Sequence, residues 1–530
     1  MDSFEGYGSL SLRCGADWDD SVMMLDDFPN SDEGISARND DVQDFRRGDE
    51  ILRLLQIAGP SMIVQFSSLF IFPQTASVVG RTLDTKDLAG FSLGSIVGNL
   101  TCTSVMIGAL TAADTLLPRK FATQNYAEMG HLATRGFIIC ALLLLFPMIV
   151  GIDATLLKRF FESFGQDPDA SSLASRWIRI YLVGVPAMLV FRLTQSWLNA
   201  QNSVWPMVYA SVISGFFVNP ILLKVFVPTL GLHGSAISIS ITQWVMVAIL
   251  FLCLVIKPTF YNQESSPKLT KSSLVRALER EPMFEFLGLS LGGVLSLSEW
   301  WFWESSCFVS GTLGVVPLVC HTIAYNLVPI IYMPCLGISM ALSIRIGHIV
   351  VHDVWKAKQL AAWSMLFTTL FGGVVSFGLK IFRLEICKLF TSDEDVIRGC
   401  EAIWPKLCCY VFILHIFGIN SAILKALGMQ WRMAAIICLC LWLGAFPCLL
   451  CFAVRHDGGL DVIWNVLPLS YGFMQVLLVL SYATADWESM ARAGRDPIPQ
   501  NSNVDGPYTY DEFRPIRSID SNTATLSILQ

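Results

Sequence analysis

The sequence predicts an all-α integral membrane protein whose twelve transmembrane helices form two six-helix pseudo-symmetric lobes. The first observation is composition: 53% of the 530 residues are hydrophobic and 15% are charged, and the apolar residues are spread along most of the chain, as in polytopic membrane proteins. The second is a series of twelve apolar windows, each about as long as the 20 residues that span a bilayer. The third is a repeat that relates the two halves of the chain.

The predicted spans follow one another from Ile51 to about residue 484. Their approximate limits are 51–79, 88–112, 131–153, 177–200, 204–227, 232–256, 284–310, 315–343, 360–380, 402–426, 431–454 and 461–484. An even number of spans places both termini on one side of the membrane. The basic residues Arg46, Arg47 and Arg53 favour the cytosolic side for that end.

Five segments are expected along the chain. Residues 1–48 are acidic and polar and lack the basic start and apolar core of a signal peptide, so they are predicted to be a disordered, uncleaved tail. Residues 51–256 are predicted to form the N-lobe, 257–283 a basic cytosolic linker and 284–485 the C-lobe. The polar residues 486–530 are predicted to form a second disordered tail.

The repeat is visible as matched residues at a nearly constant spacing. Ala200, Trp205 and Met207 stand 226 residues before Ala426, Trp431 and Met433, and Gly108 and Ala112 stand 229 residues before Gly337 and Ala341. Such a spacing favours a six-helix repeat around an axis along the membrane normal, with a binding site between the lobes near mid-membrane.

Composition also excludes several classes of protein and ligand. The 15 cysteines sit largely inside apolar runs and have no metal-ligand spacing, so they are interpreted as buried apolar residues, with no metal site. The sequence has no basic cluster with interleaved aromatic residues, so nucleic acid is not an expected ligand. It has no nucleotide-binding motif, so no cofactor is expected. The expected partners are the lipid bilayer and a small molecule.

The seventh span contains two acidic residues, Glu299 and Glu304, in a run that is otherwise apolar enough to cross a bilayer. An acid near the middle of a span costs about 2.5 to 3.5 kcal/mol, so it usually handles ions or protons. Five helical residues separate the two carboxyl groups by about 140° around the axis. Glu299 is therefore the candidate for the cavity, and Glu304 is expected at its edge or against a neighbouring helix.

Aromatic residues accompany both acids. Trp300 stands four residues before Glu304, and Trp303 stands four residues after Glu299, so each shares a helix face with one carboxyl group. A ring face and a carboxylate together suit a cationic guest, and burial of a carboxyl group favours its protonated form. The alternatives are an interfacial tryptophan belt and structural hydrogen bonds between helices.

Weaker candidates lie in other spans. The eighth span offers Asn326, Tyr325 and Tyr332 as cavity-lining groups, and the tenth span offers His415. For each of them, interhelical hydrogen bonding or simple core packing is the competing interpretation. Asp114 is expected at the cytosolic end of the second span, in a structural pair with the nearby Arg119.

Three stretches resemble the eukaryotic branch of the multidrug and toxic compound extrusion (MATE) transporters. The run Glu299-Trp300-Trp301-Phe302-Trp303-Glu304 is similar to the Glu-Trp-Trp-x-x-Glu pattern of their seventh helix, and Tyr332–Gly347 and Gly231–Ala236 are similar to runs near helices eight and six. The likeness covers residues 51 to about 485. It implies a two-lobe exporter that uses a cation gradient, usually of protons, with Glu299 as the coupling acid and Glu304 as the second acid.

The sequence also departs from that pattern. Asn326 stands where some animal members have an acid in helix eight, and Leu414 and His415 stand near the position of an acid in helix ten. Fewer cavity acids make metabolites of lower charge, or anions, easier to accommodate than in those relatives.

The predicted function is secondary active export, with protons, or sodium, exchanged by alternating access for amphiphilic organic cations or metabolites. The protein is expected to be a monomer, to have no enzymatic activity, and to reside in the plasma membrane or a vacuolar or endolysosomal membrane. A lipid-type flippase of related fold is the first alternative, although few internal cations other than Arg192, Lys224 and Lys425 could meet a phosphate. An integral-membrane transferase is the second, with the residues His321, His348, His352 and Asp353 as its only trace.

Overall fold

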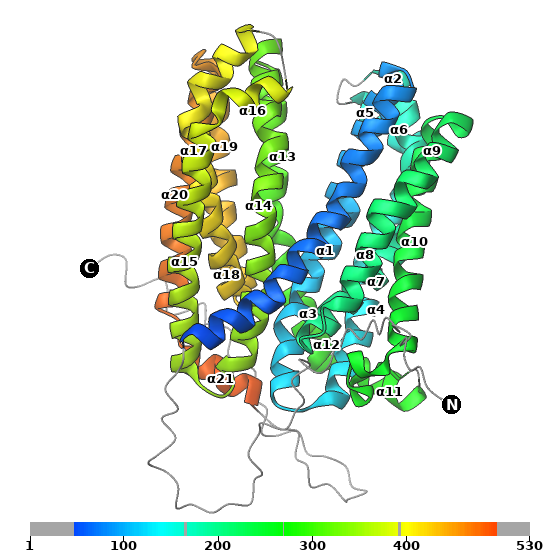
Figure 1. Ribbon diagram of the computed structural model, residues 1–530, viewed down its shortest axis with the longest axis vertical. Helices are drawn as coiled ribbons and strands as arrows, with labels where there is room; N and C mark the ends of the chain where they lie inside the picture. The colour runs from blue at the N-terminus through cyan, green and yellow to red at the C-terminus, as the bar shows by residue number, and fades with distance from the viewer. Residues whose placement is uncertain (1–46, 164–166, 269, 391–393, 496–530) are drawn as a thin grey trace, which may run out of the picture. The chain divides into compact units, whose positions relative to one another are not determined.

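The computed structural model describes residues 47–163, 167–268, 270–390 and 394–495, and every element in these ranges is helical (Figure 1). The described helices from Glu50 onward belong to one compact unit. The predicted tails 1–48 and 486–530 lie almost entirely outside the described residues. The exceptions are residues 47–48 and 486–495.

The first half of the chain forms a series of helices that ends at Ile256. They are α1 (Arg47–Thr82), α2 (Thr85–Gly98), η2 (Asn99–Thr103), α3 (Ser104–Ala122), α4 (Tyr126–Ile152), α5 (Ala154–Ser163), α6 (Pro168–Tyr181), α7 (Val185–Ala200), α8 (Trp205–Val212), η3 (Ile213–Val218), α9 (Asn219–Leu230) and α10 (Leu232–Ile256). Within this half α2 packs on α6, α10 on α9 and α6, and α3 on α4 and α7.

The second half repeats this order after three short linker helices. The linker contains η4 (Pro258–Phe260), η5 (Gln263–Ser265) and α11 (Lys271–Ala277). The later helices are α12 (Arg280–Ser296), α13 (Ser298–Gly311), α14 (Val315–Val350), α15 (Val354–Ile381), α16 (Arg383–Phe390), α17 (Glu394–Ala426), α18 (Gln430–Ile437), η6 (Cys438–Ala445), α19 (Phe446–Cys448), η7 (Leu449–Arg455), α20 (Gly459–Ala483) and α21 (Trp487–Arg495). In this half α17 packs against α14, α15 and α20 (Figure 1).

The repeat predicted from sequence spacing appears in the helix boundaries. Ala200 ends α7 and Ala426 ends α17, and each is followed within a few residues by a helix that turns into a π-helical segment, η3 in the first half and η6 in the second. The halves differ where α6 and α7 meet, because that pair is bent by 53° whereas α17 runs unbroken. Equivalent boundaries in both halves show two related helical arrays.

Ten helices in the described part of the chain are long and apolar enough to cross a membrane, and the bent pair α6–α7 adds an eleventh span. The remaining predicted span, 284–310, is divided between α12 and α13 at Leu297, and each piece is shorter than a bilayer requires on its own. The Leu297 N–H still donates to the Gly293 carbonyl and its own carbonyl accepts from the Trp300 N–H, so neither backbone group of Leu297 is left free at this break.

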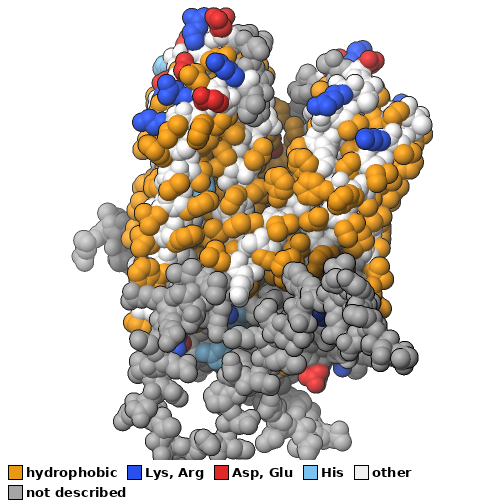
Figure 2. All heavy atoms as spheres, viewed as in Figure 1, with side chains coloured by type: hydrophobic (Ala, Val, Ile, Leu, Met, Phe, Trp, Pro, Cys, Tyr) orange, Lys and Arg blue, Asp and Glu red, His pale blue; other side chains and the backbone are white. Residues whose placement is uncertain are grey.

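The surface agrees with a membrane location. Large apolar side chains such as Phe146, Leu142, Val374 and Phe377 are exposed on the outer faces of α4 and α15. Figure 2 shows hydrophobic side chains covering the middle of the visible face, with charged side chains gathered beyond them. This band is the part of the molecule that a bilayer would cover.

The beginning of the predicted C-terminal tail is ordered as a helix, which corrects the expectation of disorder for residues 487–495. In α21, Trp487 and Ala491 are buried, the helix packs on α15, and the Trp487 indole donates a hydrogen bond of 2.8 Å to the Tyr482 carbonyl. Polar composition concealed this helix because its apolar residues recur at a helical spacing rather than in one run.

Candidate substrate and coupling site

Glu299 lies in the first turn of α13, directly after the break in the seventh span at Leu297. Its side chain is 6% exposed. The Tyr471 hydroxyl of α20 donates a hydrogen bond of 2.5 Å to its carboxylate. Within the described residues Glu299 forms no ion pair. A buried carboxyl group with a single neutral donor can hold a proton or meet a cation.

An aromatic cluster surrounds this carboxyl group and joins four helices. Trp303 of α13 stacks on Tyr410 of α17 at 5.1 Å and 1° between ring planes, and on Tyr325 of α14 at 6.0 Å. Tyr410 meets Tyr471 edge to face at 4.9 Å, and Trp464 of α20 meets Trp303 edge to face. The cluster provides rigid apolar walls with hydroxyl groups next to the acid.

Glu304 faces a different helix from Glu299, as the helical spacing predicts. It is half-buried and accepts a hydrogen bond from the Tyr325 hydroxyl of α14. Each carboxylate is therefore paired with one tyrosine on a separate neighbouring helix. Trp303 lies between the two pairs, since it stacks on Tyr325 and packs through Tyr410 toward Tyr471.

Asn326 lies outside this cluster. Its side chain is exposed and donates to the Thr322 carbonyl one turn earlier. Gly337 stands eleven residues after Asn326, a spacing that leaves the two residues only about 20° apart around α14. Gly337 lies close to the Met62 side chain of α1. Asn326 is thus on the face of α14 that meets the N-lobe further along the same helix.

Three other predicted residues have different surroundings. Trp300 is 37% exposed. His415 is fully buried, and its Nδ1 lies 2.8 Å from the Val411 carbonyl on its own helix. Tyr332 contacts the His415 ring edge to face at 6.4 Å, so this pair forms part of the packing between α14 and α17.

Several residues of the site were missed by sequence reasoning. Tyr410, Trp464 and Tyr471 complete the aromatic cluster, and hydroxyl-bearing or indole side chains in the middle of apolar spans were the available signal. The motif alone indicates no role for Trp301, yet its indole donates a hydrogen bond of 3.1 Å to the Ser104 hydroxyl of α3. This contact ties the seventh span to the N-lobe two residues from Glu299.

The two lobes contact each other near the ends of helices that lead into four short loops. These loops are residues 123–125, 201–204, 351–353 and 427–429. Thr115 of α3 donates a 2.6 Å hydrogen bond to the Lys425 carbonyl of α17, and the buried Arg119 guanidinium donates one of 2.6 Å to the Ala426 carbonyl. His348 of α14 lies 2.8 Å from the Ala200 carbonyl of α7. With twelve spans, these connections are on the same side as the chain termini, so the lobes are closed on that side.

The expected pair between Asp114 and Arg119 is wrong. Asp114 instead has Lys425 and Arg192 as its electrostatic partners and lines a cavity of about 30 Å³ with Lys425. Five residues along a helix place Asp114 and Arg119 on different faces. Asp114 thus meets a cation from the other lobe.

Comparison with known proteins gives one family. The model of the MatE family matches residues 60–225 and 293–450, one stretch in each half of the chain. Multidrug and toxin extrusion protein 1 from Homo sapiens is 26% identical over 489 residues, covering 87% of this chain and 84% of that protein. Multidrug and toxin extrusion protein 2 from Oryctolagus cuniculus is 29% identical over 388 residues, covering 72% of this chain and 62% of that protein, which is less than two thirds of its length.

Solved structures give the same fold. The eukaryotic MATE transporter AtDTX14 superposes with a TM-score of 0.74 at 21% identity, covering 84% of this chain and 98% of that one. The Vibrio cholerae MATE transporter VcmN in its bent form gives a TM-score of 0.69 at 16% identity, covering 84% and 98%. These likenesses confirm the predicted all-α fold with twelve spans in two lobes. The chain belongs to the MatE family, the multidrug and toxin extrusion transporters, as its seventh-span motif predicts.

Proposed function

We propose that this protein is a secondary active exporter in which Glu299 exchanges protons against an amphiphilic organic cation or metabolite. The observation that carries the proposal is the buried Glu299 carboxylate, which has the Tyr471 hydroxyl as its hydrogen-bond partner and no ion pair among the described residues. A proton on this group removes a buried charge, and its loss creates one, so the two protonation states favour different lobe arrangements.

Alternating access supplies the second step of this proposal. The lobes are joined on the side of the termini by Thr115, Arg119 and His348, which leaves the opposite side as the exit in this arrangement. We infer that the termini are cytosolic, so this arrangement releases substrate outward. The inverse arrangement requires these hydrogen bonds to break and the opposite ends of the lobes to meet.

The aromatic cluster and the two carboxylates favour a substrate with an apolar body and a positive or neutral polar group. A ring face attracts a cation by about 0.5 to 2 kcal/mol. Trp300 and Tyr325 are the partly exposed rings beside the buried Trp303 and Tyr410, and Glu304 supplies a second negative site beside Tyr325. We assign Glu304 to substrate binding and Glu299 to proton exchange. Sodium is the alternative coupling ion, and transport driven by a pH gradient or by a sodium gradient distinguishes the two possibilities.

Reconstituted vesicles test this assignment. The purified full chain should move a fluorescent organic cation against its gradient when a pH gradient is imposed, and not when only a sodium gradient is imposed. Glu299→Gln should abolish this coupled transport. Glu281→Gln, which removes an exposed acid at the start of α12, should leave it unchanged. Transport by Glu299→Gln at the wild-type rate would disprove the role of Glu299.

We further propose a monomer in the plasma membrane or a vacuolar or endolysosomal membrane. A tagged protein located by fluorescence microscopy, together with protease access to each terminus in sealed vesicles, tests both the membrane and the cytosolic placement of the termini.

A further inference from the structure

The linker between the lobes is folded onto the N-lobe rather than being a loose connection. The Trp197 indole of α7 donates a 3.0 Å hydrogen bond to the Ser265 carbonyl, and the Gln201 side-chain carbonyl accepts one of 2.9 Å from the Asn262 backbone. Arg135 of α4, which is 1% exposed, donates one of 3.0 Å to the Ala277 carbonyl at the end of α11. These contacts give the linker a fixed position.

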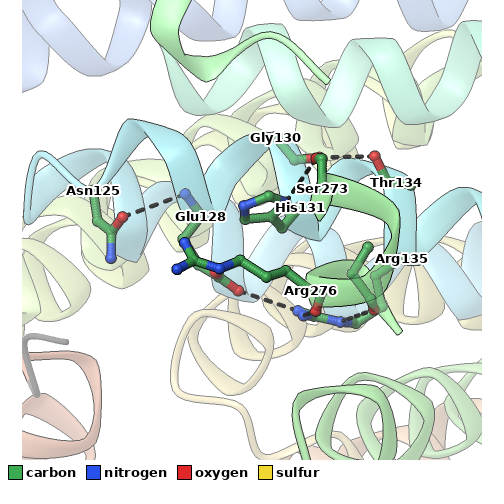
Figure 3. Close-up of polar contacts among 9 residues, drawn as sticks. Asn125, Glu128, Gly130, His131, Thr134, Arg135, Ser273 and Arg276 are labelled. Carbon is green, nitrogen blue, oxygen red and sulfur yellow. Dashed lines mark hydrogen bonds and ion pairs between the residues drawn. The ribbon is translucent and has the colours of Figure 1, made fainter. Parts of the chain in front are cut away.

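The folded linker and the start of α4 line an open cavity of about 380 Å³. Gly130 forms its floor and could not carry a side chain, because an added Cβ would lie 2.9 Å from the Ser266 carbonyl oxygen. His131 lines the cavity, and its Nδ1 lies 3.1 Å from the Ser273 hydroxyl of α11 (Figure 3). The volume lies in the range of small-molecule sites.

The polar groups of this cavity suit a phosphate ester. Lys268 and Arg276 both line it, and within the described residues neither side chain forms a hydrogen bond or an ion pair. Thr270 and Ser272 line the same space, and their hydroxyl groups lie 3.3 Å apart. Guanidinium, ammonium and hydroxyl donors around one volume are the groups that bind phosphate in proteins.

Glu264 adds a group of the opposite charge at the cavity wall. A carboxylate repels phosphate but accepts hydrogen bonds from hydroxyl groups. The combination of two cations and one carboxylate therefore matches a phosphate that is carried on a polyol ring, where the ring hydroxyls meet the carboxylate and the phosphate meets the cations.

Helix α11 supplies an independent indication of a lipid. Its Ser273 and Ala277 face is buried against α4, while Leu274, Val275 and Leu278 are exposed on other faces, Val275 to 62%. Val275 lies about 200° around the helix from both buried residues, hence on the opposite side. A short helix with exposed apolar residues beside a basic pocket, at the end of a membrane span, is typical of contact with a bilayer surface.

We propose that the cavity between α4 and the linker binds the phosphorylated polyol headgroup of a membrane lipid, with Arg276 and Lys268 on the phosphate and Glu264 on the ring hydroxyls. The apolar face of α11 lies against the acyl chains. This site is separate from the transport pathway and does not depend on the identity of the transported substrate.

Native mass spectrometry of the full chain in detergent, with added phosphatidylinositol 4-phosphate, tests the site. Arg276→Gln and Lys268→Gln should each weaken binding by about tenfold or more, since each removes a charge-assisted contact. Lys271→Gln is the matched control, because Lys271 is an exposed linker cation that does not line the cavity, and it should change binding by less than about twofold. Equal weakening by all three variants would mean that the linker attracts anions without a site.

Glu264→Gln separates the headgroup from phosphate alone. It should weaken binding of phosphatidylinositol 4-phosphate and leave binding of phosphatidic acid, which has no polyol, unchanged. Saturable binding of free inositol phosphate without binding of the lipid would overturn the lipid assignment, and failure of both to bind would overturn the site. All four variants change exposed side chains, so an unaltered melting temperature should accompany each result.

Discussion

Tyr471 of α20 donates a 2.5 Å hydrogen bond to Glu299 of α13 across 172 residues of sequence. The hydroxyl is a neutral partner, so it can serve the carboxylate in both protonation states, as a donor to the anion and as an acceptor from the acid.

Replacing this tyrosine should impair transport without unfolding the protein. Tyr471→Phe removes the hydroxyl but keeps the ring that packs on Tyr410, and we expect proton-driven transport to fall by about tenfold or more, the value of a hydrogen bond to a charged group. Tyr482→Phe, which removes a hydroxyl from the same helix that donates to Asn420, is the control. Comparable losses in both variants would argue against a special role for the Tyr471 hydroxyl.

A disulfide across the closed side should stop the transport cycle. An added Cβ on Gly347 of α14 would lie 3.0 Å from the Cβ of Pro118 of α3, which is shorter than the range of about 3.5 to 4.5 Å between the Cβ atoms of a disulfide, so the two helices must move slightly apart to form the bond. In the double variant Pro118→Cys/Gly347→Cys, oxidation should block transport and a reductant should restore it. Each single variant controls for reactions of the native cysteines. Continued transport by the cross-linked protein would show that the lobes need not separate here.

The crossing of α3 and α12 should tolerate no added side chain. A Cβ on Gly293 would lie 2.0 Å from the Thr111 hydroxyl and 2.1 Å from the Gly108 carbonyl oxygen, whereas a Cβ on Gly288 of the same helix would meet nothing within 4 Å. Gly293→Ala should therefore destabilise the closed side by about 1 to 3 kcal/mol, and Gly288→Ala should be neutral or stabilising. Melting temperatures in detergent, measured alongside transport, check this contrast.

Trp303 and Trp300 of the motif should differ in their structural importance. Trp303→Ala removes a ring stacked between Tyr410 and Tyr325, and such losses cost about 3 to 5 kcal/mol. Trp300→Ala removes a partly exposed ring and should cost much less. The melting temperature should fall by several degrees for Trp303→Ala alone. A similar fall for both would place Trp300 in the packed cluster as well.

Much of this architecture follows from residue order alone, because apolar length and the repeat near Ala200 and Ala426 report on the membrane and on the fold. The interactions that shape the site do not. Glu299 is paired through a tyrosine in another helix, and Asp114 meets Lys425 of the opposite lobe. A window of sequence averages composition over one span, so it cannot show which distant side chain is the hydrogen-bond or electrostatic partner of a buried polar group.

The divided span and the folded linker were hidden for related reasons. No proline marks the break at Leu297, whose position depends on α12 packing against α3 and α18 while α13 packs against α14 and α20. The linker has the composition of a surface loop, and its order comes from long-range partners such as Arg135 and Trp197.

Because the linker is held on the N-lobe, little free chain is left between the two lobes. Since Arg135 and Trp197 bind the linker to the N-lobe, the linker moves with the N-lobe and does not act as a flexible tether. α12 follows it after two residues and also packs on α3. α12 packs on α18 of the C-lobe as well, while α13 packs on α14 and α20, so the break at Leu297 separates a piece that contacts both lobes from a piece that packs mainly within the C-lobe. Glu299 stands two residues after this break, so the acid that would take up the proton lies where the contacts of the seventh span change from both lobes to mainly the C-lobe.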